Sequence, residues 1–193
     1  MDAICIKDLK KDLKREMDDS RYEHTLGVMY TSAALAMRYE YDMERAMLAG
    51  LMHDCAKCIP NAKKLKLAEK NELEITELER NNPFMLHAKV GAMLAKVKYD
   101  INDEEVRGAI RWHTTGKPNM NLLEKIVYVA DYIEPRRDKA PNLKEIRKLA
   151  FMDLDLALLK ILEDTLGYLG DSPEEVDSMT RETYEYYKAQ IKG

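Results

Sequence analysis

The chain has 193 residues, of which 46% are hydrophobic and 34% are charged, and its formal net charge is −4. This length fits one domain with a sizeable core and is short for two. The negative balance, without a lysine or arginine run interleaved with aromatics, argues against a general nucleic-acid-binding protein. No apolar run approaches the roughly 18 residues that a membrane span needs. Three cysteines without an N-terminal export signal predict reduced thiols in the cytoplasm.

Apolar residues recur at helical spacing along most of the chain, and no alternation of β-branched residues with period two persists. Residues 6–17 are expected to form a first amphipathic helix. Ser20, followed three residues later by Glu23, predicts a capping box that opens a second helix running to about Arg38. A third helix is expected over 42–53, with an aspartate as its cap.

The middle of the chain is rich in lysine and glutamate. Residues 62–82 predict one or two short helices with a solvated outer face, and a further helix is expected to begin near Met85. Asn102 with Glu105 predicts the cap of the next helix, and the segment 114–118 reads as a turn.

The last third again shows helical periodicity. A helix is expected over 121–135, between an asparagine cap and a proline, and another from Asn142 to Gly170. Ser172, with a proline and a glutamate after it, predicts the start of the final helix. The predicted class is therefore all-α, a single domain of about eight to ten helices.

Four histidines and two aspartates are candidate metal ligands. His53 and Asp54 are adjacent at a helix end, where the final residues can splay so that both reach one ion. A single histidine on an apolar face is more often a hydrogen-bonded core residue. Here all four histidines of the chain lie in helical segments with apolar neighbours. The full set is His24, His53, Asp54, His87, His113 and Asp131.

These ligand types favour particular metals and a particular chemistry. Imidazole and carboxylate together suit iron, manganese and zinc. Six such groups are enough for two ions, with Asp54 as a bridge between them. Paired ions suit the hydrolysis of phosphate esters, because they lower the pKa of a bridging water and neutralise charge on the phosphoryl oxygens.

Five ordered motifs resemble one known family. They are HTLGV at 24–28, AGLMHDCAK at 49–57, HAKVGA at 87–92, IRWHTTG at 110–116 and ADYIEPRR at 130–137. Together they resemble the HD-domain metal-dependent phosphohydrolase superfamily and, more closely, the YqeK family. Members of that family are bacterial enzymes that split diadenosine tetraphosphate symmetrically into two ADP. The resemblance covers nearly the whole chain.

The resemblance implies a helical bundle in which residues 1–193 form one HD domain, with a core at about 20–135 and C-terminal helices at 142–191 completing the nucleotide site. It implies iron, as one or two ions, on His24, His53, Asp54 and Asp131. His87 and His113 would complete a second metal position or contact phosphate. Manganese and zinc suit the same ligands.

The same resemblance implies a set of nucleotide contacts. They are His24, Asp54, His87, His113, Thr114, Asp131, Arg137 and the turn Leu169, Gly170, Asp171 and Ser172. Arg137 offers a planar fork of donors for phosphate oxygens, and Lys57 places a compact positive charge one turn past the His-Asp pair. Asp54, His53 and Lys57 are the expected catalytic residues.

The predicted function is the symmetrical hydrolysis of diadenosine tetraphosphate by a metal-activated water, with ADP as the leaving group. An HD-fold nucleotidase or alarmone hydrolase, a non-catalytic nucleotide or metal sensor, and an iron-dependent oxygenase stay open as alternatives. The expected partner is a nucleotide substrate, without nucleic acid or membrane. The apolar C-terminal helices are compatible with a homodimer. Trp112 is expected in the core or at a rim more often than stacked on adenine.

Overall fold

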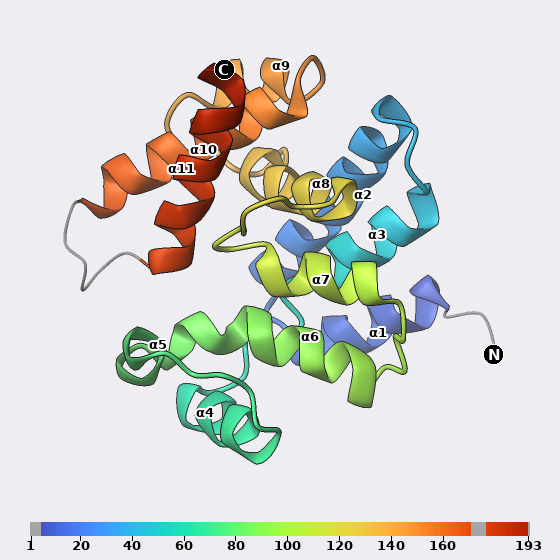
Figure 1. Cartoon of the computed structure of the whole chain (residues 1–193). Helices are drawn as coiled ribbons and strands as arrows, with labels where there is room; N and C mark the ends of the chain where they lie inside the picture. The colour runs from blue at the N-terminus through green and yellow to red at the C-terminus, as the bar shows by residue number, and fades with distance from the viewer. Residues whose placement is uncertain (1–4, 171–176, 193) are drawn as a thin grey trace.

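A computed structural model describes residues 5–170 and 177–192, and within those ranges every regular element is a helix (Figure 1). The described residues contain eleven α-helices, one more than the predicted range of eight to ten, and confirm the all-α class. In chain order the elements are α1 (Ile6–Glu16), α2 (Asp19–Arg38), α3 (Met43–Met52), α4 (Asn61–Lys70), α5 (Glu77–Asn81), the 3₁₀ helix η1 (Pro83–Leu86), α6 (His87–Val97), α7 (Glu104–Trp112), α8 (Leu122–Ile133), α9 (Leu143–Leu149), α10 (Leu154–Leu169) and α11 (Ser178–Lys192).

Helices α2, α3, α7 and α8 pack against one another around the main core. Helices α10 and α11 cover α8 on one side, and α6 lies against α7 on the other (Figure 1). A glycine permits a close approach of two helices in this core. A Cβ on Gly50 would lie 2.7 Å from Ser32 Oγ and 3.0 Å from Met29 Cα, so α3 can lie directly against α2 only without that side chain.

A second, smaller apolar cluster supports the end of the molecule that contains α4 and η1. Its buried members are Ala56, Ala68, Leu86 and Val90, and the partly buried Ile59 and several leucines pack against them. This cluster holds the start of α6 at a fixed distance from the loop that follows α3. The first residue of α6 and that loop both contribute to the site described below.

Two helix starts differ from the sequence prediction. Asp18, rather than Ser20, caps α2, and its carboxylate accepts a hydrogen bond from the backbone N–H of Arg21 at 2.8 Å. Asp103, rather than Asn102, caps α7. In both places an aspartate stands within two residues of the predicted cap, and a carboxylate satisfies the free N–H groups at a helix start while also favouring the positive end of the helix dipole.

The segment expected as one helix from Asn142 to Gly170 is instead two helices, α9 and α10, because Asp153 caps a new helix start by accepting the backbone N–H of Leu156. Several other predicted boundaries agree with the structure. Asp42 caps α3, and Asn121 forms a reciprocal capping box with Glu124 at the start of α8. Gly170 ends α10 with a positive φ of 77°. The predicted helix start at Ser172 lies outside the described residues.

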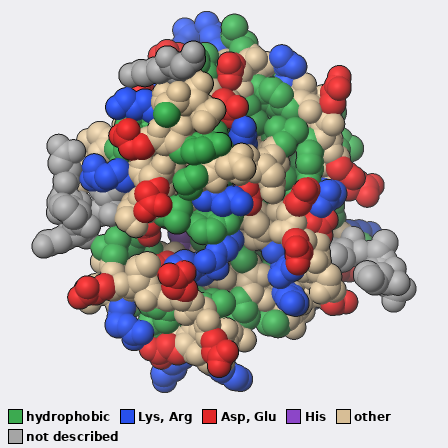
Figure 2. All heavy atoms as spheres, viewed as in Figure 1, with side chains coloured by type: hydrophobic (Ala, Val, Ile, Leu, Met, Phe, Trp, Pro, Cys, Tyr) green, Lys and Arg blue, Asp and Glu red, His purple; other side chains and the backbone are tan. Residues whose placement is uncertain are grey.

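The surface seen in Figure 2 carries acidic and basic side chains mixed across the same face. Among the described residues, every helix is too short or too polar to cross a membrane.

Candidate metal centre and adjoining pocket

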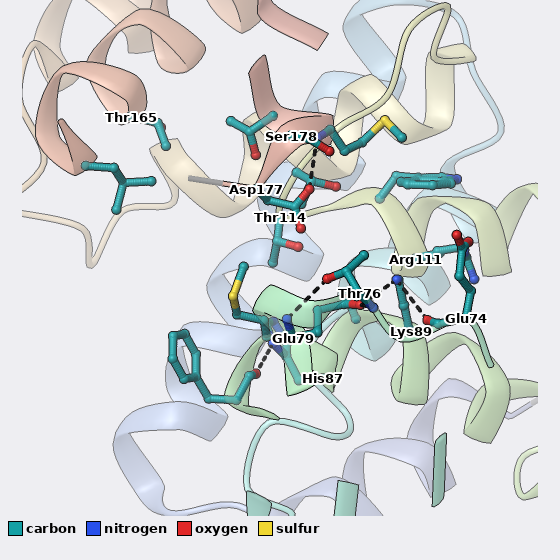
Figure 3. A pocket seen from close by; sticks show the side chains of 18 of the residues that line it. Glu74, Thr76, Glu79, His87, Lys89, Arg111, Thr114, Thr165, Asp177 and Ser178 are labelled. Carbon is teal, nitrogen blue, oxygen red and sulfur yellow. Dashed lines mark hydrogen bonds and ion pairs between the residues drawn. The ribbon is translucent and has the colours of Figure 1, made fainter. Parts of the chain in front are cut away.

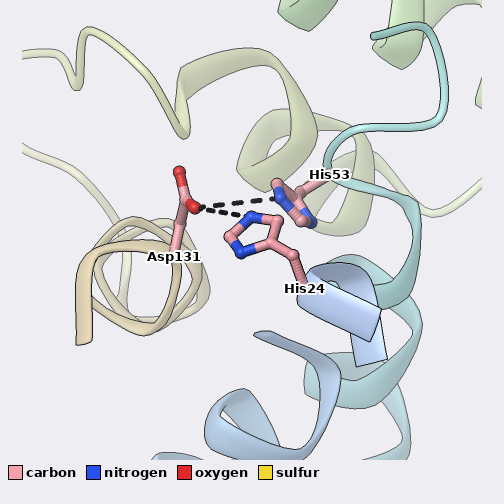
Figure 4. Close-up of side chains that lie close together, drawn as sticks. All are labelled: His24, His53 and Asp131. Atoms are coloured by element: carbon pink, nitrogen blue, oxygen red, sulfur yellow. Dashed lines mark ion pairs between the residues drawn. The ribbon is translucent and has the colours of Figure 1, made fainter. Parts of the chain in front are cut away.

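The four histidines, which come from four different helical segments, form a row in the interior. The ring centroids of His24 and His53 are 5.4 Å apart, those of His53 and His113 are 5.0 Å apart, and those of His113 and His87 are 5.1 Å apart. Asp131 of α8 reaches the first two rings, as Figure 4 shows. Helix packing therefore brings together side chains that lie more than a hundred positions apart in the sequence.

Three of the imidazoles are held through the same backbone contact. Each places Nδ1 within hydrogen-bonding distance of the carbonyl oxygen three residues earlier: His53 and Gly50 (2.7 Å), His87 and Phe84 (2.9 Å), His113 and Ile110 (2.7 Å). A carbonyl can only accept, so Nδ1 carries the proton in each ring. The Nε2 lone pair then faces the interior of the row, which is the arrangement of a metal-binding histidine.

His24 is held by carboxylates instead. Its Nδ1 lies 3.0 Å from Glu134 Oε1, and its Nε2 lies 3.1 Å from Asp131 Oδ1. Burial alone would lower the pKa of His24, but the hydrogen bonds with Asp131 and Glu134 outweigh it and raise the pKa. Glu134 is 1% exposed and lies against Gly27, where a Cβ would overlap its carboxylate. The pair His24–Glu134 has the form of the histidine–carboxylate contact that orients metal ligands.

Asp54 lies beside the middle of the row and faces three of its rings. Its Oδ1 is 3.3 Å from His87 Nε2 and 3.4 Å from His113 Nε2, and its Oδ2 is 3.7 Å from His53 Nε2. Burial opposes ionisation of this carboxyl, but the neighbouring His53, His113 and Lys57 outweigh burial and hold its pKa well below the usual range. Asp54 is therefore a charged carboxylate that could bind a metal ion together with any of these three histidines.

The donor atoms fit a cation. His53 Nε2 and Asp54 Oδ1 are buried and lack a hydrogen-bond partner among the described residues. The Nε2 atoms of His87 and His113 lie 3.3 Å apart, and two lone pairs at that distance repel unless positive charge lies close by. Lys57 Nζ, 3.0 Å from His87 Nε2, supplies part of that charge.

Two groups of three ligand atoms, each with all members within 4.8 Å of one another, could hold an ion: His24, His53 and Asp131, and His53, Asp54 and His113. Burial lowers the pKa of His53 to about 4 and that of His87 to about 3, so both are neutral and able to bind a metal at pH 7. Such a set of imidazole and carboxylate ligands fits iron, manganese or zinc.

A cavity of about 420 Å³ adjoins the His87 end of the row (Figure 3). It lies between α6 and the end of α7 on one side and α10 and α11 on the other. Of the predicted nucleotide contacts, Lys57, His87, Thr114 and Leu169 line it. Trp112 also lines this cavity.

The remaining predicted contacts lie elsewhere. Arg137 lies at the other end of the row, where its Nη2 donates to Asp131 Oδ1 at 2.9 Å. Gly170 ends the helix that walls the cavity, and it is not itself among the lining residues. Asp171 and Ser172 lie outside the described residues.

Two polar residues of the centre were not predicted from the sequence. Glu134 is the first, and a glutamate directly before a proline at the end of an apolar helix was the available signal. The second is Arg21, whose Nη1 donates to Asp54 Oδ2 at 3.0 Å. Its position three residues before His24, on the same face of α2, was the signal for it.

Comparison with known proteins identifies the family. Residues 21–136 match the model of the HD domain family. The chain is 39% identical over 174 residues to a Bacillus subtilis protein named bis(5'-nucleosyl)-tetraphosphatase, symmetrical. The aligned region covers 90% of this chain and 92% of that protein. A Staphylococcus aureus protein of the same name is 34% identical over 184 residues, with 94% of each chain covered.

A solved structure agrees with this comparison. A Clostridium acetobutylicum protein, described as a "predicted HD superfamily hydrolase involved in NAD metabolism", superposes with a TM-score of 0.92 at 39% identity, covering 96% of this chain and 98% of that one. The chain belongs to the HD-domain family. Within that family it is a member of the YqeK-like group that contains the symmetrical bis(5'-nucleosyl)-tetraphosphatases.

Proposed function

We propose that this chain hydrolyses diadenosine tetraphosphate symmetrically and releases two molecules of ADP. The observation that carries the proposal is the row of four imidazoles, with two overlapping sets of candidate metal ligands, whose His87 end adjoins a cavity of about 420 Å³. A cavity of this volume is in the range of small-ligand sites. Two relatives at 39% and 34% identity carry the name of that activity.

In this proposal, one nucleoside occupies the cavity at the His87 end. Trp112 and Phe84 give that cavity aromatic surface for a base, and Thr114 offers a hydroxyl. Lys57 Nζ lies 3.6 Å from Asp54 Oδ1, between the cavity and the row. A phosphate that leaves the cavity toward the row passes this ammonium group, which would offset its charge and hold it near the centre of the row.

We propose that His24, His53, Asp54 and Asp131 bind iron, and that His87 and His113 complete a second ion position or contact phosphate. Bound ions at such a site lower the pKa of a coordinated water and neutralise charge on phosphoryl oxygens. The protein fixes the orientation of the ligands through Glu134 and the backbone carbonyls. Manganese and zinc are the alternatives that the same ligands accept.

The test combines metal analysis with product chromatography on protein prepared without oxygen. Diadenosine tetraphosphate should yield ADP as the sole nucleotide product, with bound metal in the active preparation. Asp54→Ala should lose both metal and turnover, whereas Asp8→Ala, which changes an exposed aspartate of α1, should keep both. Release of ATP and AMP, or an active Asp54→Ala protein, contradicts the proposal.

A second candidate substrate comes from the Clostridium acetobutylicum relative, whose description mentions NAD metabolism. NAD contains two nucleotides joined through phosphates and belongs in the same substrate panel. Preferred cleavage of NAD over diadenosine tetraphosphate would favour this candidate. Location in the cytoplasm and assembly as a homodimer stay predictions of the sequence.

A further inference from the structure

A second cavity lies at the other end of the row of histidines. Its volume is about 370 Å³, and His24 lines it together with Arg21, Arg136, Arg137 and Lys139. The first cavity contains His87 and the second contains His24, which are the two terminal rings of the row. The row therefore runs from one cavity to the other, and the middle of the row, with His53, lies between them.

The two cavities differ in the chemistry of their walls. The first has aromatic and apolar side chains, including Trp112, Phe84 and Met179. Among the described residues that line the second, there is no aromatic side chain other than the imidazole of His24. The first cavity can therefore bury a base by stacking, whereas the second offers mainly charged groups.

Cationic groups in the second cavity are available to an anion. Three carboxylates line this cavity. That of Asp18 accepts the backbone N–H of Arg21, that of Glu134 contacts His24 and accepts the backbone N–H of Arg136, and that of Asp138 is exposed and forms no ion pair with a described residue. Lys139 forms no ion pair with a carboxylate in the described part of the chain.

The arginines of this cavity also have donors to spare. Arg136 makes one long, exposed ion pair, 3.7 Å from Glu23. Arg21 and Arg137 each use one guanidinium nitrogen on a carboxylate of the centre, Asp54 and Asp131 respectively, and Arg137 Nε also donates to the backbone carbonyl of Asp131. The other donors of these planar forks suit phosphate oxygens.

We propose that the second cavity binds the other nucleotide of the substrate through its phosphates, without reading its base. This inference rests on the proposed function and extends it. A tetraphosphate joining two nucleosides would lie along the row, with one nucleoside in the first cavity and the distal phosphates against the cations of the second. The enzyme then recognises one base of a symmetric substrate and tolerates change in the other.

A panel of three substrates tests the unequal reading of the two bases: diadenosine, adenosine–uridine and diuridine tetraphosphate. With one base-reading end, the mixed substrate loses only one of two equivalent orientations, so its kcat/KM should be about half that of the diadenosine compound. The kcat/KM of the diuridine compound should be lower than that of the diadenosine compound by about tenfold or more, because the smaller base stacks less well in the cavity that recognises the base.

Other results of the panel overturn the inference. If both ends recognise the base equally, the kcat/KM of the mixed substrate should equal the geometric mean of the kcat/KM values of the two symmetric substrates. If all three substrates have the same kcat/KM, neither base is recognised. If none of the three is cleaved, the proposed function fails instead, so the two failures are distinct.

A pair of matched double variants tests the location. Arg136→Ala with Lys139→Ala removes two exposed cations from the second cavity and should raise KM for diadenosine tetraphosphate about tenfold, with metal content unchanged. The control, Lys66→Ala with Arg80→Ala, removes the same two charges from the exposed faces of α4 and α5 and should leave KM unchanged. Equal KM values in the two double variants overturn the assignment of the distal phosphates to this cavity.

Discussion

The Glu134 carboxylate orients His24, and replacing it should weaken metal binding more than folding. Glu134→Gln keeps the shape of the side chain but removes the charge that faces His24 Nδ1 at 3.0 Å. Loss of such a contact typically costs about 10- to 100-fold in metal affinity or activity. Equilibrium dialysis against a graded chelator measures the affinity directly. Glu163→Gln makes the same change on an exposed part of α10 and should leave metal affinity unchanged; equal affinities in both variants would show that Glu134 does not support the centre.

The sequence indicated the candidate ligands of this site more readily than the residues that contact them. His24, His53 and Asp54 could be proposed because histidine is rare in the chain and a buried carboxylate needs a partner. Glu134 and Arg21 were missed because glutamate and arginine are abundant, and most of them lie on the surface. Their roles depend on which helix faces cross: Glu134 lies 110 positions from His24 and Arg21 lies 33 positions from Asp54, so the local signals at these residues could not show which group each one contacts.

The sequence predicted that most segments of the chain form helices, but it did not predict the exact residue at which each helix begins. The apolar periodicity of α1 is strong enough to identify that helix from the sequence, whereas the same signal predicted α9 and α10 as one helix. The starts of α2 and α7 were misplaced because several capping residues stand together there. Asp18, Asp19 and Ser20 are all acceptable caps by type. The choice among them depends on the angle at which the chain enters the helix, which tertiary packing decides.

Close packing of α3 on α2 makes Gly50 sensitive to substitution. In Gly50→Ala the added Cβ would lie 3.1 Å from Val28 O and closer still to Met29 Cα, and backbone atoms cannot move aside cheaply. Overpacking of this kind costs about 1 to 3 kcal/mol. Urea denaturation of the metal-free protein measures the change in the free energy of unfolding.

Gly167 of α10 provides the matched control for that substitution. Apart from its chain neighbours and the backbone of its own helix, no atom lies within 4 Å of a Cβ built on Gly167. Since alanine is the better helix former, Gly167→Ala should stabilise the protein by about 0.5 to 1 kcal/mol. Equal effects of the two substitutions would show that helix contact at Gly50 is not the cause.

For the whole molecule, the metal centre and the fold depend on each other. The six candidate ligands come from helices that begin as early as α2 and end as late as α8, so they meet only after the bundle has formed. A metal that binds the folded chain in preference to the unfolded chain therefore stabilises the entire bundle. When the metal is removed, the same ligands are largely buried polar groups, and the folded state is destabilised under conditions that would protonate the histidines.

Protonation of those ligands should make the metal-free protein sensitive to mild acid. Burial lowers the pKa of His53 to about 4 and that of His87 to about 3, from 6.5 in the unfolded chain. Between pH 6.5 and 4 the unfolded state therefore binds protons that the folded state does not. Stability must fall as pH falls through that window, by up to about 1.4 kcal/mol per pH unit for each histidine.

Asp54, Asp131 and His24 also contribute to the pH dependence of folding stability. The depressed pKa values of Asp54 and Asp131 extend the loss of stability below pH 3.8. His24, whose pKa is raised, gives a smaller contribution of opposite sign, since its stabilisation is present below pH 6.5 and fades as pH rises through its folded-state pKa.

Urea titrations of chelator-treated protein at pH 7 and pH 5 measure the effect, and the free energy of unfolding should fall by about 2 to 4 kcal/mol. His53 and His87 are already unprotonated in the folded state at pH 5, but His24, whose pKa is raised, must release a proton to bind metal there, so added metal should raise stability by less at pH 5 than at pH 7. The same free energy of unfolding at pH 7 and pH 5 in the metal-free protein would mean that these histidines are not buried as neutral groups, and the arrangement of the centre would then have to differ from the one described.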